Sequence, residues 1–282
     1  MNIGICGLGT VACGVINVWQ RNQSLLTSRA GQNSVITHIG ARRDNPACDT
    51  HAYTVSRDIF AVVNDPSVDV VVELIGGIEP ARQLVMEAIA AGKHVVTANK
   101  ALIAEHGDEI LAAAALADVE VRFEAAVAGG IPVIKALTEG LSGNAIESIV
   151  GIINGTGNYI LTEMREKNRS FEDALADAQR LGYAEADPTY DVEGIDAAQK
   201  LTILAALAYG TPLDASRCYT EGISAVSVAD MTYANELGYC IKHLGIARAT
   251  KQGLEMRVHP ALIPKSRLIA NVNGVLNAVA IH

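Results

Sequence analysis

The stretch Ile3-Gly4-Ile5-Cys6-Gly7-Leu8-Gly9-Thr10-Val11-Ala12 opens the chain and decides its fold. It carries the pattern Gly-x-Gly-x-x-Ala where an apolar run gives way to a helical pattern. In a strand–turn–helix unit that binds a dinucleotide, Gly7 permits the tight turn and Gly9 lets the backbone approach the pyrophosphate. Ala12 is small enough for the helix to lie close to the strand. The helix N-terminus then offers free N–H groups to the phosphates. A glycine turn without a ligand is the competing interpretation, but the position of the turn favours cofactor binding.

The strand-then-helix alternation continues through the first 125 residues. Apolar runs without polar alternation predict parallel strands covered on both faces, at residues 2–6, 35–41, 69–75, 94–98 and 119–125. Helical patterns lie between them, at residues 10–21, 57–64, 81–91 and 101–117. We expect Ser56 to cap the second helix, Pro80 to open the third and Gly92 to end it. Short connections of this kind imply right-handed crossovers and a Rossmann-type doubly wound parallel sheet, an α/β fold.

The pattern changes after residue 125. Helices are expected at residues 132–141, 171–181 and 194–209, and strands at 145–154, 241–250 and 254–258. This arrangement is typical of an α+β domain, and 282 residues suit two domains. We therefore predict a dinucleotide-binding domain over residues 1–125 and a substrate-binding, catalytic domain over residues 126–282.

Composition excludes several classes of protein. The net charge of -9 argues against nucleic-acid binding, which rests on clustered Lys and Arg. No apolar run reaches the ~20 residues that a membrane helix requires. The five cysteines are scattered without a CxxC pair, which favours reduced thiols over disulfides or zinc. No basic-then-apolar leader opens the chain. We therefore expect a cytoplasmic protein with no membrane partner.

The second predicted strand ends in Gly40-Ala41-Arg42-Arg43-Asp44. An NAD enzyme usually places an acidic residue here, against the 2′-hydroxyl of the ribose. Arg42 and Arg43 come first in this chain, and arginine matches phosphate geometry bidentately. We therefore predict NADP, with Arg42 at the 2′-phosphate. The alternative is a pair of solvated arginines, with Asp44 on the hydroxyl of NAD.

The densest polar chemistry lies in the stretch from Leu181 to Lys200. Asp196 and Lys200 are four residues apart and share a helix face, which continues through apolar Leu204. A lysine beside carboxylates in a partly dry cleft can exchange a proton with a hydroxyl or carbonyl. We predict that four acidic residues of this stretch converge on Lys200. Glu185 and Asp191 are expected to hold a substrate ammonium or orient the lysine. The alternative is an ordinary i,i+4 salt bridge with helix-capping acids.

Two further segments are candidates for the site. Thr97-Ala98-Asn99-Lys100 follows the fourth predicted strand, at the sheet edge where open α/β folds bind ligands. Lys100 is therefore either catalytic or cofactor-facing, or it is a surface residue that begins a helix. Asn154-Gly155-Thr156-Gly157-Asn158 ends a strand and begins a helix, and it offers donors to a carboxylate. A tight turn with an N-cap is the competing explanation.

At these residues the sequence resembles the homoserine dehydrogenase family. The signature runs from Ala178 to Lys200, with Gly-Tyr, Asp-Pro, Asp-Val, Gly, Asp and a closing Lys at the family spacing. Further matching blocks occur in the same order along nearly the whole chain: Gly7 to Val11, Glu73 to Gly77, Thr97 to Leu102, Asn154 to Thr156, His259 to Ala261 and Val272 to Val275.

The resemblance implies NAD(P)-dependent interconversion of L-homoserine and L-aspartate 4-semialdehyde, a step towards threonine, methionine and isoleucine. It makes Lys200 the proton donor and acceptor, positioned by Asp196, with Lys100 at the nicotinamide end. Substrate-binding residues would be Glu185, Asp191, Thr156, Gly182 and Tyr183. Cofactor-binding residues would be Gly7, Leu8, Gly9, Thr10, Val11, Arg42 and Lys100.

The family also binds a monovalent cation, typically sodium, and forms dimers through its second domain. The matching cation ligands are Glu124, Val127, Gly129 and Ile131, mostly through backbone oxygens, and a homodimer is expected. The chain stops at Ala280-Ile281-His282, where relatives continue into a Gly-rich loop, so a truncated chain is expected. Two other functions are compatible with the residues: another small amino-acid dehydrogenase, or a chain that binds dinucleotide without catalysis.

Overall fold

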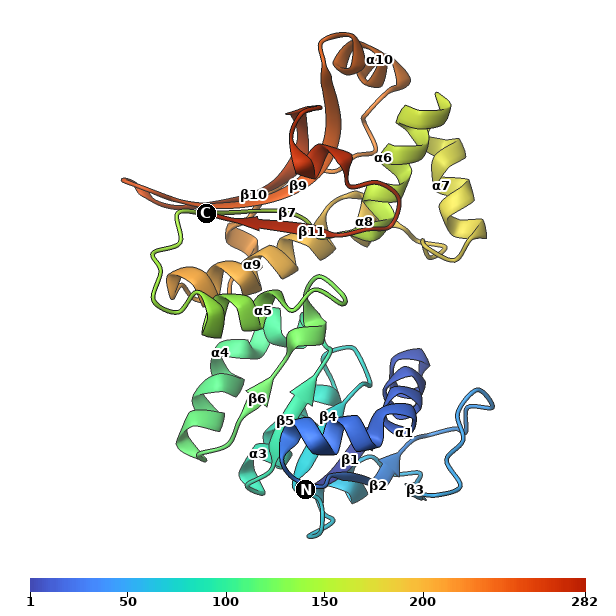
Figure 1. The fold of residues 1–282 in the computed structure, drawn as a ribbon, viewed down its shortest axis with the longest axis vertical. Helices are drawn as coiled ribbons and strands as arrows, with labels where there is room; N and C mark the ends of the chain where they lie inside the picture. Colours follow the sequence, from blue (N-terminus) through green and yellow to red (C-terminus); the bar gives the residue numbers. More distant parts are fainter. The chain divides into compact units, whose positions relative to one another are not determined.

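The computed structural model describes all residues from Met1 to His282 and divides into two compact units. The first unit is Met1–Ala126 and the second is Val127–His282. The division follows Ala126, beside the change of pattern in the sequence. Each unit has its own sheet and core, and each is described by itself (Figure 1).

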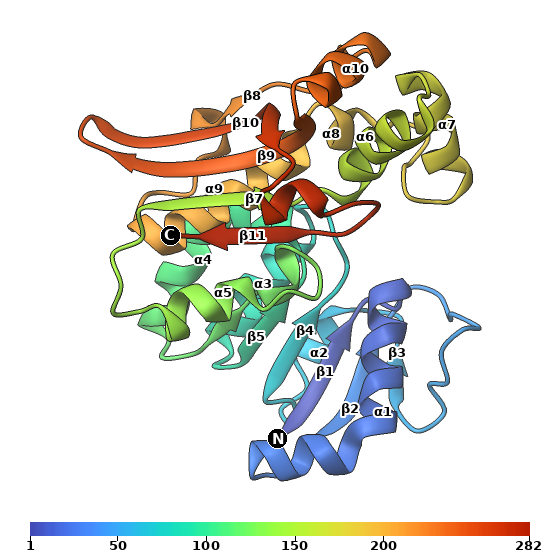
Figure 2. The same ribbon diagram turned by 45° about the horizontal axis from the view of Figure 1, so that its top comes forward.

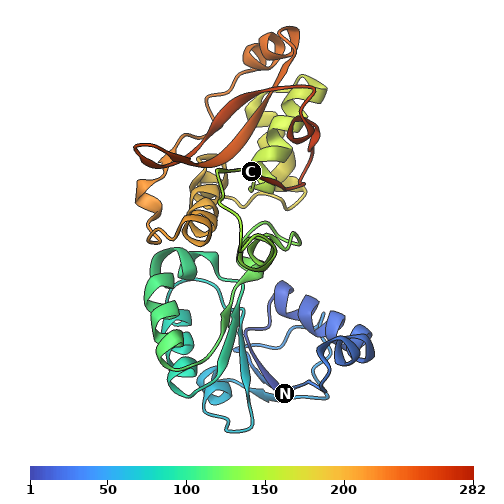
Figure 3. The ribbon, with the colours of Figure 1, turned by 60° about the vertical axis from the view of Figure 1, so that its left-hand side comes forward.

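The first unit is built on a six-stranded parallel sheet in the order β3-β2-β1-β4-β5-β6. The chain starts in the middle, runs to one edge, then returns and continues to the other, as a doubly wound sheet does. Helix α1 lies on one side of the sheet and α3 and α4 lie on the other (Figure 3). The elements are β1 Asn2–Cys6, α1 Thr10–Ala30, β2 Val35–Gly40, β3 Thr54–Ser56, α2 Phe60–Val63, β4 Val70–Glu73, α3 Ala81–Ala90, β5 His94–Thr97, α4 Lys100–Leu116, β6 Val121–Arg122 and a 3-10 turn, Glu124–Ala126.

Buried aliphatic side chains explain why these segments form strands. Ile3 and Ile5 of β1 pack with Ile36 and Ile39 of β2 and with Ile16 of α1 in one core. Continuous apolar runs of this kind bury both faces of a parallel strand. The prediction of a Rossmann-type fold is confirmed.

Several predicted boundaries in the first unit are wrong. Helix α1 continues to Ala30, where Gly31 ends it in a left-handed conformation. Ser56 does not cap a helix. It ends β3, a strand that the sequence pattern missed, and its hydroxyl lies 2.6 Å from His38 Nε2. Helix α2 begins only at Phe60 and has no side-chain cap. A three-residue edge strand leaves too short a pattern to recognise.

The second unit carries a five-stranded mixed sheet in the order β11-β7-β9-β10-β8. Strands β9 and β10 form a long antiparallel pair, with α6 and α7 side by side at one end (Figure 2). The elements are α5 Val133–Lys135, a π-helical turn Ala136–Gly140, β7 Ser148–Ile152, α6 Gly155–Lys167, α7 Phe171–Arg180, α8 Thr189–Val192, α9 Ile195–Tyr209, a 3-10 turn Ala215–Arg217, β8 Tyr219–Thr220, α10 Val228–Glu236, β9 Tyr239–Thr250, β10 Gly253–Pro264, a 3-10 turn Leu268–Asn271 and β11 Ala278–Ile281.

Helices α6, α7 and α10 share a buried apolar cluster with β9. Ile160, Met164 and Ala174 are fully enclosed in it. The α+β prediction for this part is confirmed, although β8, α10 and β11 were not predicted. None of the helices combines the length and the apolar character needed to span a membrane.

Candidate functional site

The glycine turn after β1 has the geometry that its residues predict. Gly7 adopts φ +103°, and a Cβ there would lie 2.5 Å from the carbonyl oxygen of Leu74. Gly9 precedes α1 as its N-cap, and a Cβ there would meet nothing within 4 Å. Ala12, in the first turn of α1, is fully buried. Gly7 is thus required by the fold, whereas Gly9 leaves open space at the start of α1 for a ligand.

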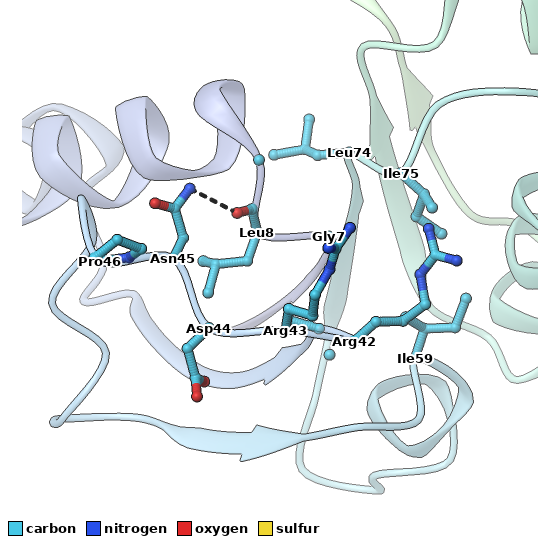
Figure 4. A pocket seen from close by; sticks show the side chains of 13 residues that line it. Gly7, Leu8, Arg42, Arg43, Asp44, Asn45, Pro46, Ile59, Leu74 and Ile75 are labelled. Atoms are coloured by element: carbon cyan, nitrogen blue, oxygen red, sulfur yellow. Dashed lines mark hydrogen bonds between the residues drawn. The ribbon is translucent and has the colours of Figure 1, made fainter.

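A cavity of about 470 Å³ lies over this turn. It is lined by the turn, the end of β2 and the loop after β4: Gly7, Leu8, Gly9, Gly40, Ala41, Arg42, Arg43, Asp44, Asn45, Pro46, Ile59, Leu74 and Ile75. The guanidinium groups of Arg42 and Arg43 point one way from the loop and the Asp44 carboxylate points the other (Figure 4). Arg57 holds that carboxylate through two hydrogen bonds of 2.8 and 2.9 Å. Both side chains are largely exposed, at 56% for Arg57 and 71% for Asp44, so this ion pair does not prevent Asp44 from binding a ribose hydroxyl.

Asn45 is a pocket residue that the sequence pattern did not single out. Its side-chain Nδ2 donates to the carbonyl oxygen of Leu8 at 3.0 Å, which ties the loop after β2 to the glycine turn (Figure 4). Its Oδ1 accepts from the N–H of Ala47. Asparagine is typical of such turns, but the sequence could not show which backbone group it would bind.

The carboxyl edge of β4 and β5 is organised by the buried carboxylate of Glu73. Its Oε2 accepts from the Thr97 hydroxyl at 2.5 Å, and its Oε1 accepts from the N–H groups of Ile75 and Gly76. Asn99 then caps α4 and donates to the Gly77 carbonyl at 2.6 Å. Lys100 is the half-buried first residue of α4, at this edge of the sheet.

In the second unit, a network of buried polar groups surrounds Lys200. Its Nζ lies 2.6 Å from Asp196 Oδ2 and donates to the carbonyl oxygen of Ile153 at 3.0 Å. Asn154 Nδ2 donates to Asp196 Oδ2 at 2.9 Å and to Asp191 Oδ1 at 2.7 Å. The Lys200 and Asp196 side chains are only 18% and 4% exposed. This pair is therefore not an ordinary solvated salt bridge.

The expectation that four acidic residues converge on Lys200 is wrong. Asp196 contacts the lysine directly, and Asp191 joins it only through Asn154. Asp187 instead accepts from the N–H of Thr189, the first residue of α8. Glu185 is exposed. Asp196 is the only carboxylate hydrogen-bonded to Lys200, so spacing along the chain overstated the convergence of the acids.

Thr156 and Tyr183 are brought together beside this network. The Thr156 hydroxyl donates to the Tyr183 carbonyl oxygen at 2.7 Å. Gly182 ends α7 with φ +77°, and the Tyr183 ring meets Tyr159 edge-on at 5.0 Å between centroids. Thr156 lies in the first turn of α6, where helix N–H groups without intrahelical partners can bind a carboxylate.

Asn154 and the carbonyl of Ile153 are the members of the network that were not assigned in advance. Asn154 Oδ1 accepts from Gly157 N–H as the N-cap of α6, so its Nδ2 is the group left to face the two aspartates. The sequence predicts that the run from Asn154 to Asn158 ends a strand, begins a helix and offers donors to a carboxylate, and this prediction is the signal that points to Asn154. Its hydrogen bond to Asp196, 42 residues further along the chain, was not visible in the sequence.

The residues expected to bind a cation lie in two segments. Glu124 is in the last turn of the first unit. Val127, Gly129 and Ile131 belong to the second unit, where Ala128 and Gly129 adopt left-handed φ values of 59° and 57°. No group of three or more His, Cys, Asp or Glu side chains in the structure could hold a metal ion.

The glycine turn, the cavity and the sheet order define the first unit as a dinucleotide-binding domain of the Rossmann class. Residues 7–124 match the family model described as the NAD binding domain of homoserine dehydrogenase. Residues 132–282 match the model described as homoserine dehydrogenase. The chain therefore belongs to the homoserine dehydrogenase family.

Known relatives agree with this assignment. The chain is 63% identical over its whole length to a homoserine dehydrogenase of Pseudomonas aeruginosa and covers 65% of that protein. A crystal structure of a homoserine dehydrogenase from Thiobacillus denitrificans is 57% identical, with a TM-score of 0.97 over the whole of this chain and 65% of that one. A hyperthermophilic archaeal homoserine dehydrogenase in complex with NADPH is 26% identical, with a TM-score of 0.81, over 99% of this chain and 87% of that one. The chain thus spans about two thirds of the length of the Pseudomonas aeruginosa and Thiobacillus denitrificans proteins.

Proposed function

We propose that the protein interconverts L-homoserine and L-aspartate 4-semialdehyde with a nicotinamide dinucleotide, and that it prefers NADP. The observation that carries this proposal is the buried contact between Lys200 and Asp196 in a chain of the homoserine dehydrogenase family. The name of the relatives supports homoserine as the substrate, and the geometry of the network supports Lys200 as the reacting group.

Lys200 is the proposed proton-transfer group. A bound nicotinamide dinucleotide supplies the hydride acceptor. As hydride leaves the carbon that bears the hydroxyl, the hydroxyl proton passes to Lys200 Nζ in its neutral form. In the reverse direction the ammonium returns that proton to the carbonyl oxygen. Asp196 and the Ile153 carbonyl hold Nζ in one position. The proton-transfer group is therefore already oriented when the substrate binds, which lowers the entropic cost of the reaction.

The remaining substrate contacts are proposed from side-chain chemistry. Glu185 and Asp191 would attract the ammonium of homoserine. Thr156 at the start of α6, with the Gly182–Tyr183 backbone, would receive its carboxylate. Lys100, at the carboxyl edge of the first sheet, would serve the nicotinamide end.

The preference for NADP is proposed from the arginines at the end of β2. Both line the cavity above the glycine turn, and the neighbouring carboxylate is held by Arg57. An unneutralised pair of guanidinium groups favours a 2′-phosphate. Contacts from Leu8, Thr10 and Val11 are proposed with those of Gly7 and Gly9. The archaeal relative named above was solved with NADPH.

A monovalent cation at Glu124, Val127, Gly129 and Ile131, a homodimer and a cytoplasmic location remain predictions. Omitting sodium and potassium from the assay and measuring the molecular mass by light scattering test the first two directly.

The test of the proposed function is NADP-linked oxidation of L-homoserine by the purified protein, compared with L-serine, L-threonine and other short amino alcohols. Homoserine should give by far the highest kcat/KM, and NADP should be used better than NAD. If another amino alcohol gave the highest kcat/KM, the protein would be a dehydrogenase of that substrate instead. Binding of NADP by calorimetry without turnover of any substrate would support a non-catalytic dinucleotide-binding protein instead.

A further inference from the structure

His243, in strand β9, is a buried side chain that the proposed reaction does not use. Its Nε2 lies 2.8 Å from the carbonyl oxygen of Glu221. Because a carbonyl oxygen can only accept, Nε2 carries the proton and Nδ1 is bare in the neutral ring. Nδ1 is buried and has no hydrogen-bond partner. A buried polar atom without a partner needs an explanation.

The ring packs against the starts of two helices. A Cβ added at Gly157, in the first turn of α6, would lie 3.7 Å from His243 Nδ1. A Cβ added at Gly194, the N-cap of α9, would lie 3.0 Å from His243 Cε1. Both neighbours are glycines, so the imidazole approaches the backbone of both helices with no side chain between.

These two helix starts carry the network around Lys200. The N–H of Gly157 is bound by Asn154 Oδ1 at 2.7 Å, which turns Asn154 Nδ2 towards Asp196. Asp196 lies two residues after Gly194, in the first turn of α9. A shift of either helix start would change the separation of Asn154 and Asp196, and with it the position of Lys200.

We infer that His243 is a positioning residue, whose neutral imidazole holds the starts of α6 and α9 at the separation that the Asn154–Asp196–Lys200 network needs. The predicted effect of His243 on catalysis rests on the proposed function. The structural part of the inference, the support of two helix starts, stands independently of the substrate.

Protonation of the ring would disturb this arrangement. A second N–H at Nδ1 would face Gly157 with no acceptor, in a buried place. Burial lowers the pKa of His243, and the charge of His259 on β10 lowers it further, against the opposing effects of the Glu221 carbonyl and the carboxylates of Glu193 and Glu221. The folded protein therefore resists protonation of this ring, and the neutral state persists at neutral pH.

The experiment compares the wild-type protein with His243→Gln, His243→Ala and, as a matched control, His51→Gln at an exposed histidine of the first unit. Glutamine keeps a donor for the Glu221 carbonyl and has no titratable proton. Alanine removes the side chain that fills the space between the starts of α6 and α9. We expect His243→Ala to lower kcat/KM for homoserine about tenfold to a hundredfold, with the dissociation constant of NADP unchanged. His243→Gln should restore most of the activity at neutral pH, and its thermal midpoint should fall less than that of the wild type between pH 7 and pH 5.

Hydrogen exchange separates this inference from the proposed function. Peptides covering residues 154–160 and 194–200 should exchange faster in His243→Ala than in the wild type or in His51→Gln, whether or not homoserine is a substrate. Unchanged exchange in these peptides, or a kcat/KM within twofold of the wild type, would overturn the inference. If the wild type does not oxidise homoserine but the exchange does increase, the proposed function fails and the positioning role stands.

Discussion

Lys200 Nζ lies 2.6 Å from Asp196 Oδ2, and the two side chains are separated by one turn of α9. The Lys135–Glu139 pair has the same spacing in sequence, but its side chains are 66% and 53% exposed, against 18% and 4% for Lys200 and Asp196. Exposed i,i+4 pairs contribute little, whereas a buried carboxylate hydrogen-bonded to a lysine fixes the position of its Nζ. Burial therefore distinguishes a site from a surface salt bridge of identical spacing.

Replacing Asp196 with asparagine keeps the shape of the side chain and removes its charge. We expect Asp196→Asn to lower kcat for homoserine oxidation by about a hundredfold, because Lys200 loses the group that positions it. Breaking a buried pair also costs roughly 3–5 kcal/mol of stability, which denaturant unfolding would measure. Glu139→Gln, in the exposed pair, serves as the control and should change both quantities little. Equal effects of the two substitutions would show that the buried pair has no special role.

Arg42 should determine the preference between the two dinucleotides. A hydrogen bond to a charged group contributes about 1.5–3 kcal/mol, so Arg42→Gln should raise the KM for NADP by roughly tenfold to a hundredfold and leave that for NAD nearly unchanged. Initial rates with each cofactor at saturating homoserine check this. Arg29→Gln, in the last turn of α1, controls for the loss of a positive charge. A parallel loss with NAD and NADP would mean that Arg42 does not bind the 2′-phosphate.

Replacing Gly7 by alanine should lower the stability of the fold, whereas replacing Gly9 by alanine should weaken cofactor binding. A Cβ at Gly7 would meet the Leu74 carbonyl at 2.5 Å in a left-handed backbone, so Gly7→Ala should destabilise the fold by roughly 1–3 kcal/mol or more. A Cβ at Gly9 meets nothing within 4 Å, so Gly9→Ala should melt like the wild type but bind NADP more weakly. Thermal unfolding and calorimetry measure the two effects. An unchanged dissociation constant of NADP in Gly9→Ala would contradict the prediction that the pyrophosphate binds at this turn.

The buried side chain of Lys242 should make the free energy of unfolding depend on pH in the alkaline range. Its side chain is fully buried against Asn158 and the Val272 carbonyl, and burial lowers its pKa from 10.5 to about 8. Between pH 8 and pH 10.5 the unfolded chain binds a proton that the folded chain does not, so this group makes the protein more stable as pH rises through that window.

The comparison of Lys242→Met with the wild type isolates this contribution. The variant should lack a pH-dependent gain of up to about 3 kcal/mol, because each pKa unit corresponds to about 1.4 kcal/mol. Lys265→Met, at an exposed lysine, should keep the wild-type dependence. Identical curves for the wild type and Lys242→Met between pH 8 and pH 10 would contradict the lowered pKa.

The sequence was informative where one local pattern implies one structure. The run from Ile3 to Ala12 predicted a strand, a tight turn and a helix, because the φ of Gly7 and the small side chain of Ala12 are local requirements. Long apolar periodicities such as that of α9 were equally clear. Short or edge elements, such as β3 and β8, were missed because two or three residues carry no periodicity.

The site was less predictable than the fold. Spacing placed Asp196 and Lys200 on one helix face, but it could not show that Asn154 would bind both Asp191 and Asp196. It also predicted four acidic residues around the lysine, whereas only Asp196 binds its Nζ directly. Such contacts depend on how α6, α8 and α9 pack against one another. The order of residues along the chain does not reveal this packing.

The most direct test of the account is the rate of NADP reduction by L-homoserine in the wild type and in Lys200→Met, with NADP affinity measured on both proteins. Methionine keeps the length of the side chain and cannot accept a proton. The account predicts that the wild type turns over homoserine and that Lys200→Met binds NADP with unchanged affinity while its kcat falls by about a thousandfold. A variant that retains a tenth or more of the wild-type kcat would contradict the assignment of Lys200 as the proton-transfer group.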